Sequence, residues 1–321
     1  MNSLQLERIG ELKIRQMPMP VAGSDERLLK VTHCALCRTD AKMWQKGHRD
    51  LVLPRIMGHE ICGISVENGK RFVAWPGRAC GHCDPCRKGH ENLCSEMQIT
   101  GFHKNGGLAE YVGVAESGLT PVPDGLPGDI ASLAEPLACG INALQQTGLG
   151  KEDKLLIYGA GTVGLLMSLA ARAQDAVPFI RDICPAKLAK SEDFRDKIGV
   201  ACAEKSGNPD FDVVVNAAPA SETFLKGLCD LKPGGCFCLF SGLTDALPIP
   251  VSALNDIHYR QLRVVGAYGC TRDQMKMAVD ILRDFKTEVK CLIEDHVELK
   301  QVPAMLSKIL EGKALKFVVR F

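Results

Sequence analysis

The chain has 321 residues, 46% of them hydrophobic and 24% charged, which is typical of a globular protein with about two domains. Lys and Arg (39) nearly balance Asp and Glu (38), so the overall charge favours neither nucleic acid nor an anionic membrane as a partner. The first ten residues lack the long apolar core of a signal peptide, and no apolar run approaches the ~20 residues of a membrane span. We therefore expect a cytoplasmic protein that binds neither nucleic acid nor membranes.

The first third of the chain is rich in Gly and Pro and predicts an irregular β domain. Short apolar stretches are separated by turn sequences such as Asn68-Gly69, which is the pattern of strands joined by tight turns. We expect strands at 28–33, 63–67, 71–75 and 108–114.

From about residue 129, helix-length apolar patterns alternate with short apolar strands. We expect helices at 130–146, 163–174, 221–231, 273–285 and 299–310, and strands at 154–158, 177–181, 211–216, 236–240, 264–268 and 317–321. The alternation in the middle third predicts a parallel, doubly wound sheet, and the fold class is therefore α/β.

A glycine fingerprint follows the strand expected at 154–158. Gly159, Gly161 and Gly164 have G-x-G-x-x-G spacing between a strand and a helix, the context that lets a backbone approach a dinucleotide pyrophosphate. Asp182 ends the next strand, where an acid binds the ribose hydroxyls and repels the 2′-phosphate of NADP. This favours NAD, although Arg181 beside it keeps NADP open. The glycines alone would also suit another Rossmann-like protein, such as a methyltransferase.

Four of the fifteen cysteines lie within fifteen residues, as Cys80-x-x-Cys83-x-x-Cys86-x7-Cys94. Four thiolates form the closed tetrahedral shell of a structural zinc, which leaves no open position for chemistry. No basic recognition helix accompanies them, so a DNA-reading zinc module is disfavoured. The other cysteines are scattered singly, which favours a reducing compartment over a disulfide framework.

A catalytic zinc needs three protein ligands and an open fourth position. Candidates are Cys37, His59 and Glu135, which flank the four-cysteine segment. Each has a simpler alternative: a core thiol, a packed imidazole, and an acid at the start of a helix.

Together these motifs resemble the zinc-dependent branch of the medium-chain dehydrogenase/reductase superfamily, and the likeness covers nearly the whole chain. The matching segments, in chain order, are Cys37-x-Thr39-Asp40, Gly58-His59-Glu60, the four cysteines, Gly106-Gly107-Leu108-Ala109-Glu110-Tyr111, Glu135-Pro136 and the glycine fingerprint with its acid. The resemblance implies a GroES-like catalytic domain (1–128 and 268–321), a central Rossmann domain (129–267), and an active site in the cleft between them.

The resemblance also implies roles for single residues. Cys37, His59 and Glu135 would bind the catalytic zinc, Glu60 would ligate it or exchange with water, and Asp40 would orient the histidine. Thr39 would accept the substrate proton while zinc polarises the alcohol and the nicotinamide receives hydride. The implied cofactor-binding residues are Arg38, Gly159, Gly161, Thr162, Val163, Gly164, Asp182 and Lys187.

Two positions depart from the family pattern. Lys42 stands where alcohol dehydrogenases often have the outer histidine of a proton relay, so the proton would leave through water or the cofactor ribose. Arg38 stands where the polyol and threonine dehydrogenases usually have Gly; it would contact the pyrophosphate, or it is simply solvated. Cys139 is a rival to Glu135 as the third ligand.

Glu135, in place of the cysteine of classical alcohol dehydrogenases, favours a polyol, a sugar alcohol, or a hydroxy- or amino-acid type of secondary alcohol as substrate. The residues expected near the metal are Trp44, His48, Arg49, Phe102, His103 and Lys104, whose basic character would suit a polyol or an anionic hydroxy compound. The segment 262–268 resembles the strand that pairs across a dimer in this family, so we expect a homodimer or homotetramer. The alternatives are a classical alcohol dehydrogenase, a zinc-free NADPH reductase and a non-catalytic zinc protein on the same scaffold.

Overall fold

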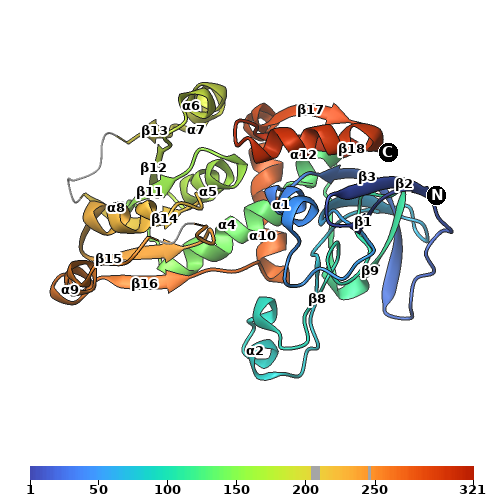
Figure 1. The fold of residues 1–321 in the computed structure, drawn as a ribbon, viewed down its shortest axis with the longest axis horizontal. Helices are drawn as coiled ribbons and strands as arrows, with labels where there is room; N and C mark the ends of the chain where they lie inside the picture. Colours follow the sequence, from blue (N-terminus) through green and yellow to red (C-terminus); the bar gives the residue numbers. More distant parts are fainter. Residues whose placement is uncertain (204–209, 245–246) are drawn as a thin grey trace. The chain divides into compact units, whose positions relative to one another are not determined.

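The computed structural model describes residues 1–203, 210–244 and 247–321 (Figure 1). These residues form two compact units, the first made of Met1–Ala138 with Cys270–Phe321 and the second of Cys139–Gly269. The boundary near residue 138 falls inside helix α4 (Ala134–Thr147). The domain limits given above, 1–128 with 268–321 and 129–267, stay a prediction. Among the described residues, no helix has the length and apolar character needed to cross a membrane.

Unit 1 is rich in short β-strands, as the Gly- and Pro-rich first third of the sequence predicts. Its strands are β1 (Asn2–Arg8), β2 (Glu11–Gln16), β3 (Glu26–Ala35), β4 (Arg55–Ile56), β5 (Glu60–Ser65), β6 (Arg71–Ala74), β7 (Gly77–Arg78), β8 (Gln98–Ile99), β9 (Tyr111–Ala115), β10 (Leu119–Pro121), β17 (Ile293–Val297) and β18 (Lys316–Arg320). The main sheet has the order β10-β6-β5-β3-β18-β17, with β9 also paired to β3, and smaller sheets are β2-β1-β4 and β7-β8. The strand β18 therefore lies beside β3, although more than 250 residues separate them in the sequence.

The helices of unit 1 include α1, which packs on this sheet and carries part of the site described below. They are α1 (Arg38–Lys46), α2 (Asp84–Arg87), α3 (Gly128–Ala131), α10 (Arg272–Asp284), α11 (Lys286–Val289), α12 (Val302–Leu310) and the short 3-10 turns at Glu91–Leu93, Glu116–Gly118, Lys290–Leu292 and Leu299–Gln301. The apolar core includes Leu29 and Val31 of β3, Met43 of α1 and Leu306 of α12, all almost fully buried. Helix α1 is thus fixed against the sheet through its apolar face.

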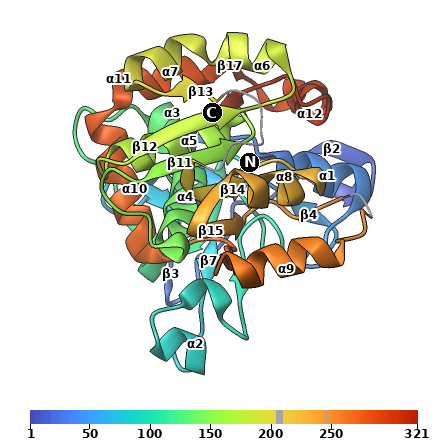
Figure 2. The same ribbon diagram turned by 90° about the vertical axis from the view of Figure 1, so that its left-hand side faces the viewer.

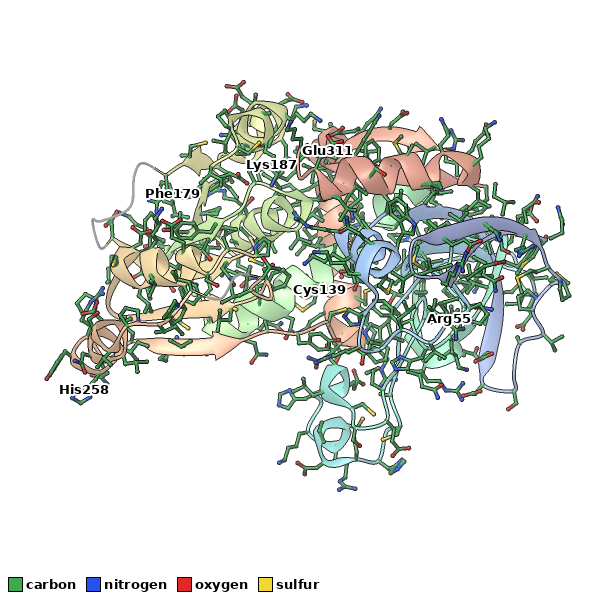
Figure 3. The ribbon with its side chains drawn as sticks, viewed as in Figure 1. Arg55, Cys139, Phe179, Lys187, His258 and Glu311 are labelled. Carbon is green, nitrogen blue, oxygen red and sulfur yellow. The ribbon has the colours of Figure 1, made fainter. Side chains whose placement is uncertain are left out.

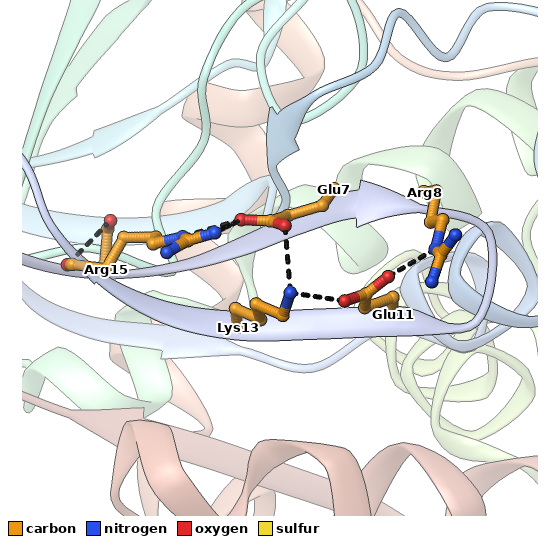
Figure 4. Close-up of polar contacts among 6 residues, drawn as sticks. Glu7, Arg8, Glu11, Lys13 and Arg15 are labelled. Carbon is orange, nitrogen blue, oxygen red and sulfur yellow. Dashed lines mark hydrogen bonds and ion pairs between the residues drawn. The ribbon is translucent and has the colours of Figure 1, made fainter.

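The outer face of the hairpin β1–β2 carries a row of ion pairs (Figure 4). Glu7 contacts Lys13 and Arg15, and Glu11 contacts Lys13 and Arg8. Because these groups are in contact with water, the row adds little to stability, and its charges keep an edge hairpin soluble.

Unit 2 is a parallel six-stranded sheet of β11 (Lys154–Tyr158), β12 (Val177–Arg181), β13 (Ala201–Cys202), β14 (Phe211–Asn216), β15 (Leu231–Leu239) and β16 (Arg263–Gly266). Its order, β13-β12-β11-β14-β15-β16, is that of a Rossmann fold, which reverses between β11 and β14 (Figure 2). The helices of the described part are the second half of α4, α5 (Thr162–Arg172), α6 (Pro185–Lys190), α7 (Glu192–Ile198), α8 (Glu222–Asp230) and α9 (Val251–Tyr259). Helix α5 joins β11 to β12 on one side of this reversal, and α8 joins β14 to β15 on the other. Because such connections are right-handed, the two helices lie on opposite faces of the sheet.

The predicted α/β class, a β-rich domain with a doubly wound parallel sheet, is confirmed. The strands expected at 154–158, 177–181 and 211–216 have the predicted limits. The helix expected at 130–146 is two helices, α3 and α4, and the helix expected at 299–310 begins with a 3-10 turn before α12.

Candidate active site and cofactor site

The first predicted metal ligand, Cys37, is the residue that begins helix α1. Its sulfur accepts the backbone N–H of Thr39 at 3.4 Å, and its own N–H donates to Oδ2 of Asp40 at 2.9 Å. This reciprocal capping satisfies two of the donors that a helix start leaves open. The cap fixes the position of the thiol and places Thr39 in the first helical turn.

The second predicted ligand, His59, follows Gly58 in a tightly packed turn before β5. Gly58 has a φ of +91°, and a Cβ at Gly106 would lie 2.1 Å from the carbonyl oxygen of Gly58. The backbone at 106 can approach Gly58 this closely only because it carries no Cβ, and the positive φ favours glycine at 58. The Gly106-Gly107 pair of the sequence motif therefore holds the backbone that presents His59.

Asp40 joins the two segments. Its Oδ1 accepts the N–H of Gly58 at 3.3 Å and lies 3.3 Å from Nδ1 of His59, and the side chain is fully buried. Asp40 thus lies where a residue orienting the His59 ring would lie, with Nε2 left to bind a metal. Burial opposes a charged imidazole, but the negative charges of Asp40 and Cys37 outweigh it and raise the pKa of His59 well above its usual value. The site therefore attracts positive charge.

The structure brings Cys37, His59 and Glu60 together, with their ligand atoms within 4.8 Å of one another. Glu60, the first residue of β5, is fully buried, and both of its oxygens accept hydrogen bonds from Nζ of Lys316, at 2.9 and 2.7 Å. Lys316 also donates to the carbonyl of Leu36 at 3.1 Å. Burial raises the pKa of Glu60, the ammonium of Lys316 opposes this, and nearby Glu135 adds to it.

Lys316 is a buried cation that the sequence reasoning missed. It begins β18, inside the otherwise apolar stretch Leu315 to Val319, and only 4% of its side chain is exposed. A single lysine in an apolar strand was the available signal, because such a residue needs a buried acidic partner.

Glu135 is outside the cluster formed by Cys37, His59 and Glu60. It lies in the first turn of α4, half-buried, with its carboxylate within 4.8 Å of the sulfur of Cys270. The negative charge of Glu135 raises the pKa of both Glu60 and Lys316. Glu135 therefore lies near the cluster of Cys37, His59 and Glu60 but is not one of its members.

The residues at this site fit zinc. One sulfur, one imidazole nitrogen and carboxylate oxygen are the donor types that tetrahedral zinc takes, and three protein ligands leave a position for substrate. The charges that raise the pKa of His59 are also those that would hold a divalent cation.

The four-cysteine lobe includes α2 and projects from the rest of unit 1 (Figure 1). The sulfurs of Cys80, Cys83, Cys86 and Cys94 lie within 4.8 Å of one another. Backbone N–H groups of Cys80 and Glu96 donate to the sulfur of Cys94, at 3.2 and 3.3 Å. Backbone hydrogen bonds, first from Cys86, lower the pKa of Cys83 to about 6, whereas burial and then the Cys83 side chain raise the pKa of Cys86 to about 12. Such N–H···S bonds favour thiolates, which are the form that binds a structural zinc.

In unit 2, the glycine loop forms an open cradle at the reversal of the sheet. A Cβ at Gly164 would lie 2.1 Å from the carbonyl oxygen of Gly159, whereas a Cβ at Gly161 would meet nothing within 4 Å. Gly161 is the N-cap of α5, and no side chain caps this helix. The N–H groups of Thr162 and Val163 thus begin a helix whose N-terminus suits a pyrophosphate.

A pocket of about 570 Å³ adjoins this loop, lined by residues that include Gly159, Asp182 and Lys187. Asp182 Oδ2 accepts the N–H of Ala160 at 2.7 Å, and Oδ1 accepts that of Cys184 at 2.8 Å. The ammonium of Lys187, labelled in Figure 3, lies 3.5 Å from Asp182 Oδ2. The structure therefore groups Gly159, Asp182 and Lys187 around one pocket, whereas the predicted Arg38 belongs to unit 1.

Four of the residues expected near the metal differ in their surroundings. The Phe102 ring lies 5.3 Å from that of His48 and 5.4 Å from that of His59, which places His48 and Phe102 beside the metal cluster. By contrast, Arg49 pairs with Asp50 at 3.3 Å, and Lys104 pairs with Glu26 at 2.6 Å.

Comparison with known proteins agrees with this geometry. Residues 23–124 match the alcohol dehydrogenase GroES-like domain. The chain is 29% identical to D-altritol 5-dehydrogenase of Agrobacterium fabrum, over 96% of each chain, and 27% identical to an uncharacterized zinc-type alcohol dehydrogenase-like protein of Haemophilus influenzae, over 95% of this chain and 93% of that protein. A zinc-binding dehydrogenase of Sinorhizobium meliloti 1021, solved with bound NADP, superimposes with a TM-score of 0.90 at 27% identity and covers 100% of this chain and 99% of its own.

Residues 23–124 thus belong to the alcohol dehydrogenase GroES-like domain family, and nearly the whole chain is similar to zinc-type dehydrogenases. The predicted family, the oxidoreductase class and the cofactors zinc and NAD(P) are thereby confirmed.

Proposed function

We propose that this dehydrogenase oxidises a secondary alcohol of a polyol to a ketone, with NAD as hydride acceptor. The observation that carries the proposal is that Cys37, at the start of α1, meets His59 and Glu60, at the start of β5, in one largely buried, negatively charged cluster. A closed structural zinc lobe and a dinucleotide pocket accompany it in the same chain. The named relative that oxidises altritol supports a polyol as the substrate class.

The catalytic zinc would be held by Cys37, His59 and one carboxylate. Glu60 lies nearer to the other two, but Lys316 engages both of its oxygens. Because Lys316 holds Glu60, we take Glu135 as the resting ligand, with Glu60 available for exchange. When bound, zinc acts as a Lewis acid that lowers the pKa of the substrate hydroxyl.

Thr39 would take the proton of the substrate hydroxyl. Its side chain is half-buried in the first turn of α1, two residues after the cap Cys37. The proton then passes to water or the cofactor ribose. Lys42 stands where related enzymes often have the outer histidine of the proton relay. Burial, and then the charge of Arg38, lower the pKa of Lys42. Arg38 as a pyrophosphate contact stays a prediction.

The surroundings of the metal cluster favour a neutral polyol over an anionic hydroxy acid. Phe102 and His48 offer an aromatic wall and one imidazole. Since Arg49 and Lys104 are ion-paired, the basic character expected of this region is largely neutralised.

NAD is favoured over NADP because Arg181, the cation that could bind a 2′-phosphate, is already bonded to other side chains. Arg181 donates to the buried carboxylate of Asp230 and to the hydroxyl of Tyr158, while Asp182 is present to bind ribose hydroxyls.

A substrate panel tests this function. Purified protein with two zinc ions per chain is assayed with sugar alcohols, sugar acids, sugar phosphates and simple primary alcohols, with NAD and with NADP, by following reduced nicotinamide at 340 nm. We expect the highest kcat/KM with a neutral sugar alcohol and NAD. Preference for simple primary alcohols would support the classical alcohol dehydrogenase alternative, and full activity without zinc would support the reductase alternative.

The assembly would be a homodimer or homotetramer formed through unit 2. The strand β16 is an edge of the parallel sheet, and Val264 on it is 38% exposed. The preceding helix α9 exposes Val251 and Leu254. An exposed apolar edge of this kind pairs readily with a second copy. We expect light scattering to give a dimer or tetramer for the native chain and a smaller species for Val264→Glu; a native monomer would contradict this.

A further inference from the structure

The adenosine end of the proposed cofactor site has a feature that the fingerprint residues do not explain. Tyr158 ends β11, Arg181 ends β12 in register beside it, and Asp230 ends α8. The Tyr158 hydroxyl and the Arg181 guanidinium both donate to Oδ2 of Asp230, and Arg181 donates to Tyr158 Oη at 2.8 Å. Tyr158 and Arg181 line the pocket that holds Asp182. The inference that follows rests on the NAD preference proposed above.

Asp230 occupies a position that disfavours an acid unless a cation accompanies it. Its side chain is 1% exposed, and it lies at the C-terminal end of a helix, where the helix dipole repels negative charge. Arg181 is 15% exposed, and its guanidinium stacks over the Tyr158 ring, with its carbon 5.3 Å from the ring centre. Withdrawing Arg181 from Asp230 would leave a buried carboxylate without its cation, which is strongly unfavourable.

Each cation that lines the pocket has an acidic neighbour among the described residues. Arg181 has Asp230, Lys187 has Asp182 at 3.5 Å, and Lys226 has Glu222 at 2.8 Å. The Lys226–Glu222 pair is exposed to water, whereas the Arg181–Asp230 pair is not. A 2′-phosphate would bring about two negative charges into a pocket whose cations are already balanced, and the most strongly held of these is Arg181.

We propose that Asp230 is a specificity-determining residue for the cofactor, and that it selects a ribose 2′-hydroxyl over a 2′-phosphate by holding Arg181. It acts through Arg181 and does not itself line the pocket. Removing its charge leaves Arg181 with a net positive charge at the adenosine pocket, where it can pair with the 2′-phosphate of NADP(H). Asp182 and Lys187 remain in place to bind the ribose.

The test is the binding of NADH and NADPH to Asp230→Asn, measured by calorimetry without alcohol or turnover. We expect the ratio of Kd for NADPH to Kd for NADH to fall about tenfold or more relative to the native protein, as one unbalanced charge near a dianion predicts. In the double variant Arg181→Met/Asp230→Asn the fall should disappear. An unchanged ratio in folded Asp230→Asn, or a fall that persists in the double variant, would overturn the proposal.

Two further variants sharpen the result. Glu222→Gln removes one acid from the same pocket, but its partner Lys226 is exposed to water, so we expect a smaller change in the ratio; an equal change would show a general charge effect and overturn a specific role for Asp230. Tyr158→Phe loosens the hold on Arg181 without burying an unpaired charge. If Asp230→Asn does not fold, an unchanged ratio in Tyr158→Phe is the overturning result.

Failure of the proposed function has a different signature. A native protein that binds neither NADH nor NADPH contradicts the dehydrogenase function itself. A native preference for NADPH contradicts the choice of NAD, while the direction of the change in Asp230→Asn still tests the role of Asp230.

Discussion

Replacing Lys316 by Met is expected to destabilise unit 1 by about 3–5 kcal/mol, because removing one partner of a buried ion pair leaves the other charge without compensation. Glu60 is fully buried and has both oxygens on the Lys316 ammonium. Both tryptophans, Trp44 and Trp75, belong to unit 1. Urea unfolding followed by tryptophan fluorescence, on the zinc-free protein, therefore measures this unit.

The double variant Glu60→Gln/Lys316→Met should recover a large part of this loss, because it removes both charges together. Lys300→Met is the matched control: Lys300 also pairs with an acid, Glu298 at 2.8 Å, but its side chain is 70% exposed, and we expect little change. Repeating the measurement with zinc adds a second result. If zinc takes Glu60 as a ligand, it replaces the missing ammonium and the loss becomes smaller. A loss in Lys316→Met no larger than that in Lys300→Met would contradict the buried pair as described.

Replacing Cys37 by Ser is expected to lower the zinc content from two ions to one per chain and to reduce kcat/KM by roughly 10³-fold or more, since Lewis-acid assistance contributes several kcal/mol to such reactions. Serine is a good N-cap, so α1 should still begin at Arg38. Zinc is measured by emission spectrometry on dialysed protein, and the remaining ion should belong to the four-cysteine lobe.

Cys202→Ser is the control, because Cys202 is an exposed cysteine outside both clusters, and it should keep two zinc ions and full activity. Glu135→Gln and Glu60→Gln, assayed in the same way, separate the two candidate carboxylates: the resting ligand is the one whose loss lowers zinc affinity more. Turnover unchanged in Cys37→Ser would contradict the catalytic role of this cluster and support a zinc site without catalytic function.

The Rossmann unit was predictable because its strands are continuous apolar runs between helices of ordinary length. The strands at 154–158 and 177–181 are read directly from such runs, and the glycines mark the turn between strand and helix. The hairpin β1–β2 was not predicted, although polar and apolar residues alternate along β2; its apolar residues Leu12 and Ile14 are not buried, so this strand adds little to the core. Helix α9 was also missed; its apolar residues Val251 and Leu254 are exposed, so they do not form the buried stripe that periodicity detects.

Local motifs located the site residues, and tertiary contacts decided how they are arranged. Spacing grouped the four cysteines, and the contact between Gly58 and Gly106 explains two motifs that are separate in the sequence. The sequence could not rank Glu60 against Glu135, because the difference lies in Lys316, a residue more than 250 positions away. Likewise, the sequence shows Arg181 next to Asp182, but it does not show that Arg181 contacts Asp230, which is 49 residues away.

The strand β18 has a consequence for the order in which the protein can be completed on the ribosome. It lies between β3 and β17 in the sheet of unit 1, and it carries the ammonium that balances Glu60. Unit 2 is continuous in sequence and is translated before β18, so it can fold while unit 1 still lacks this strand. During that interval the nascent chain holds Glu60 without the ammonium of Lys316, which both of its oxygens contact in the complete chain.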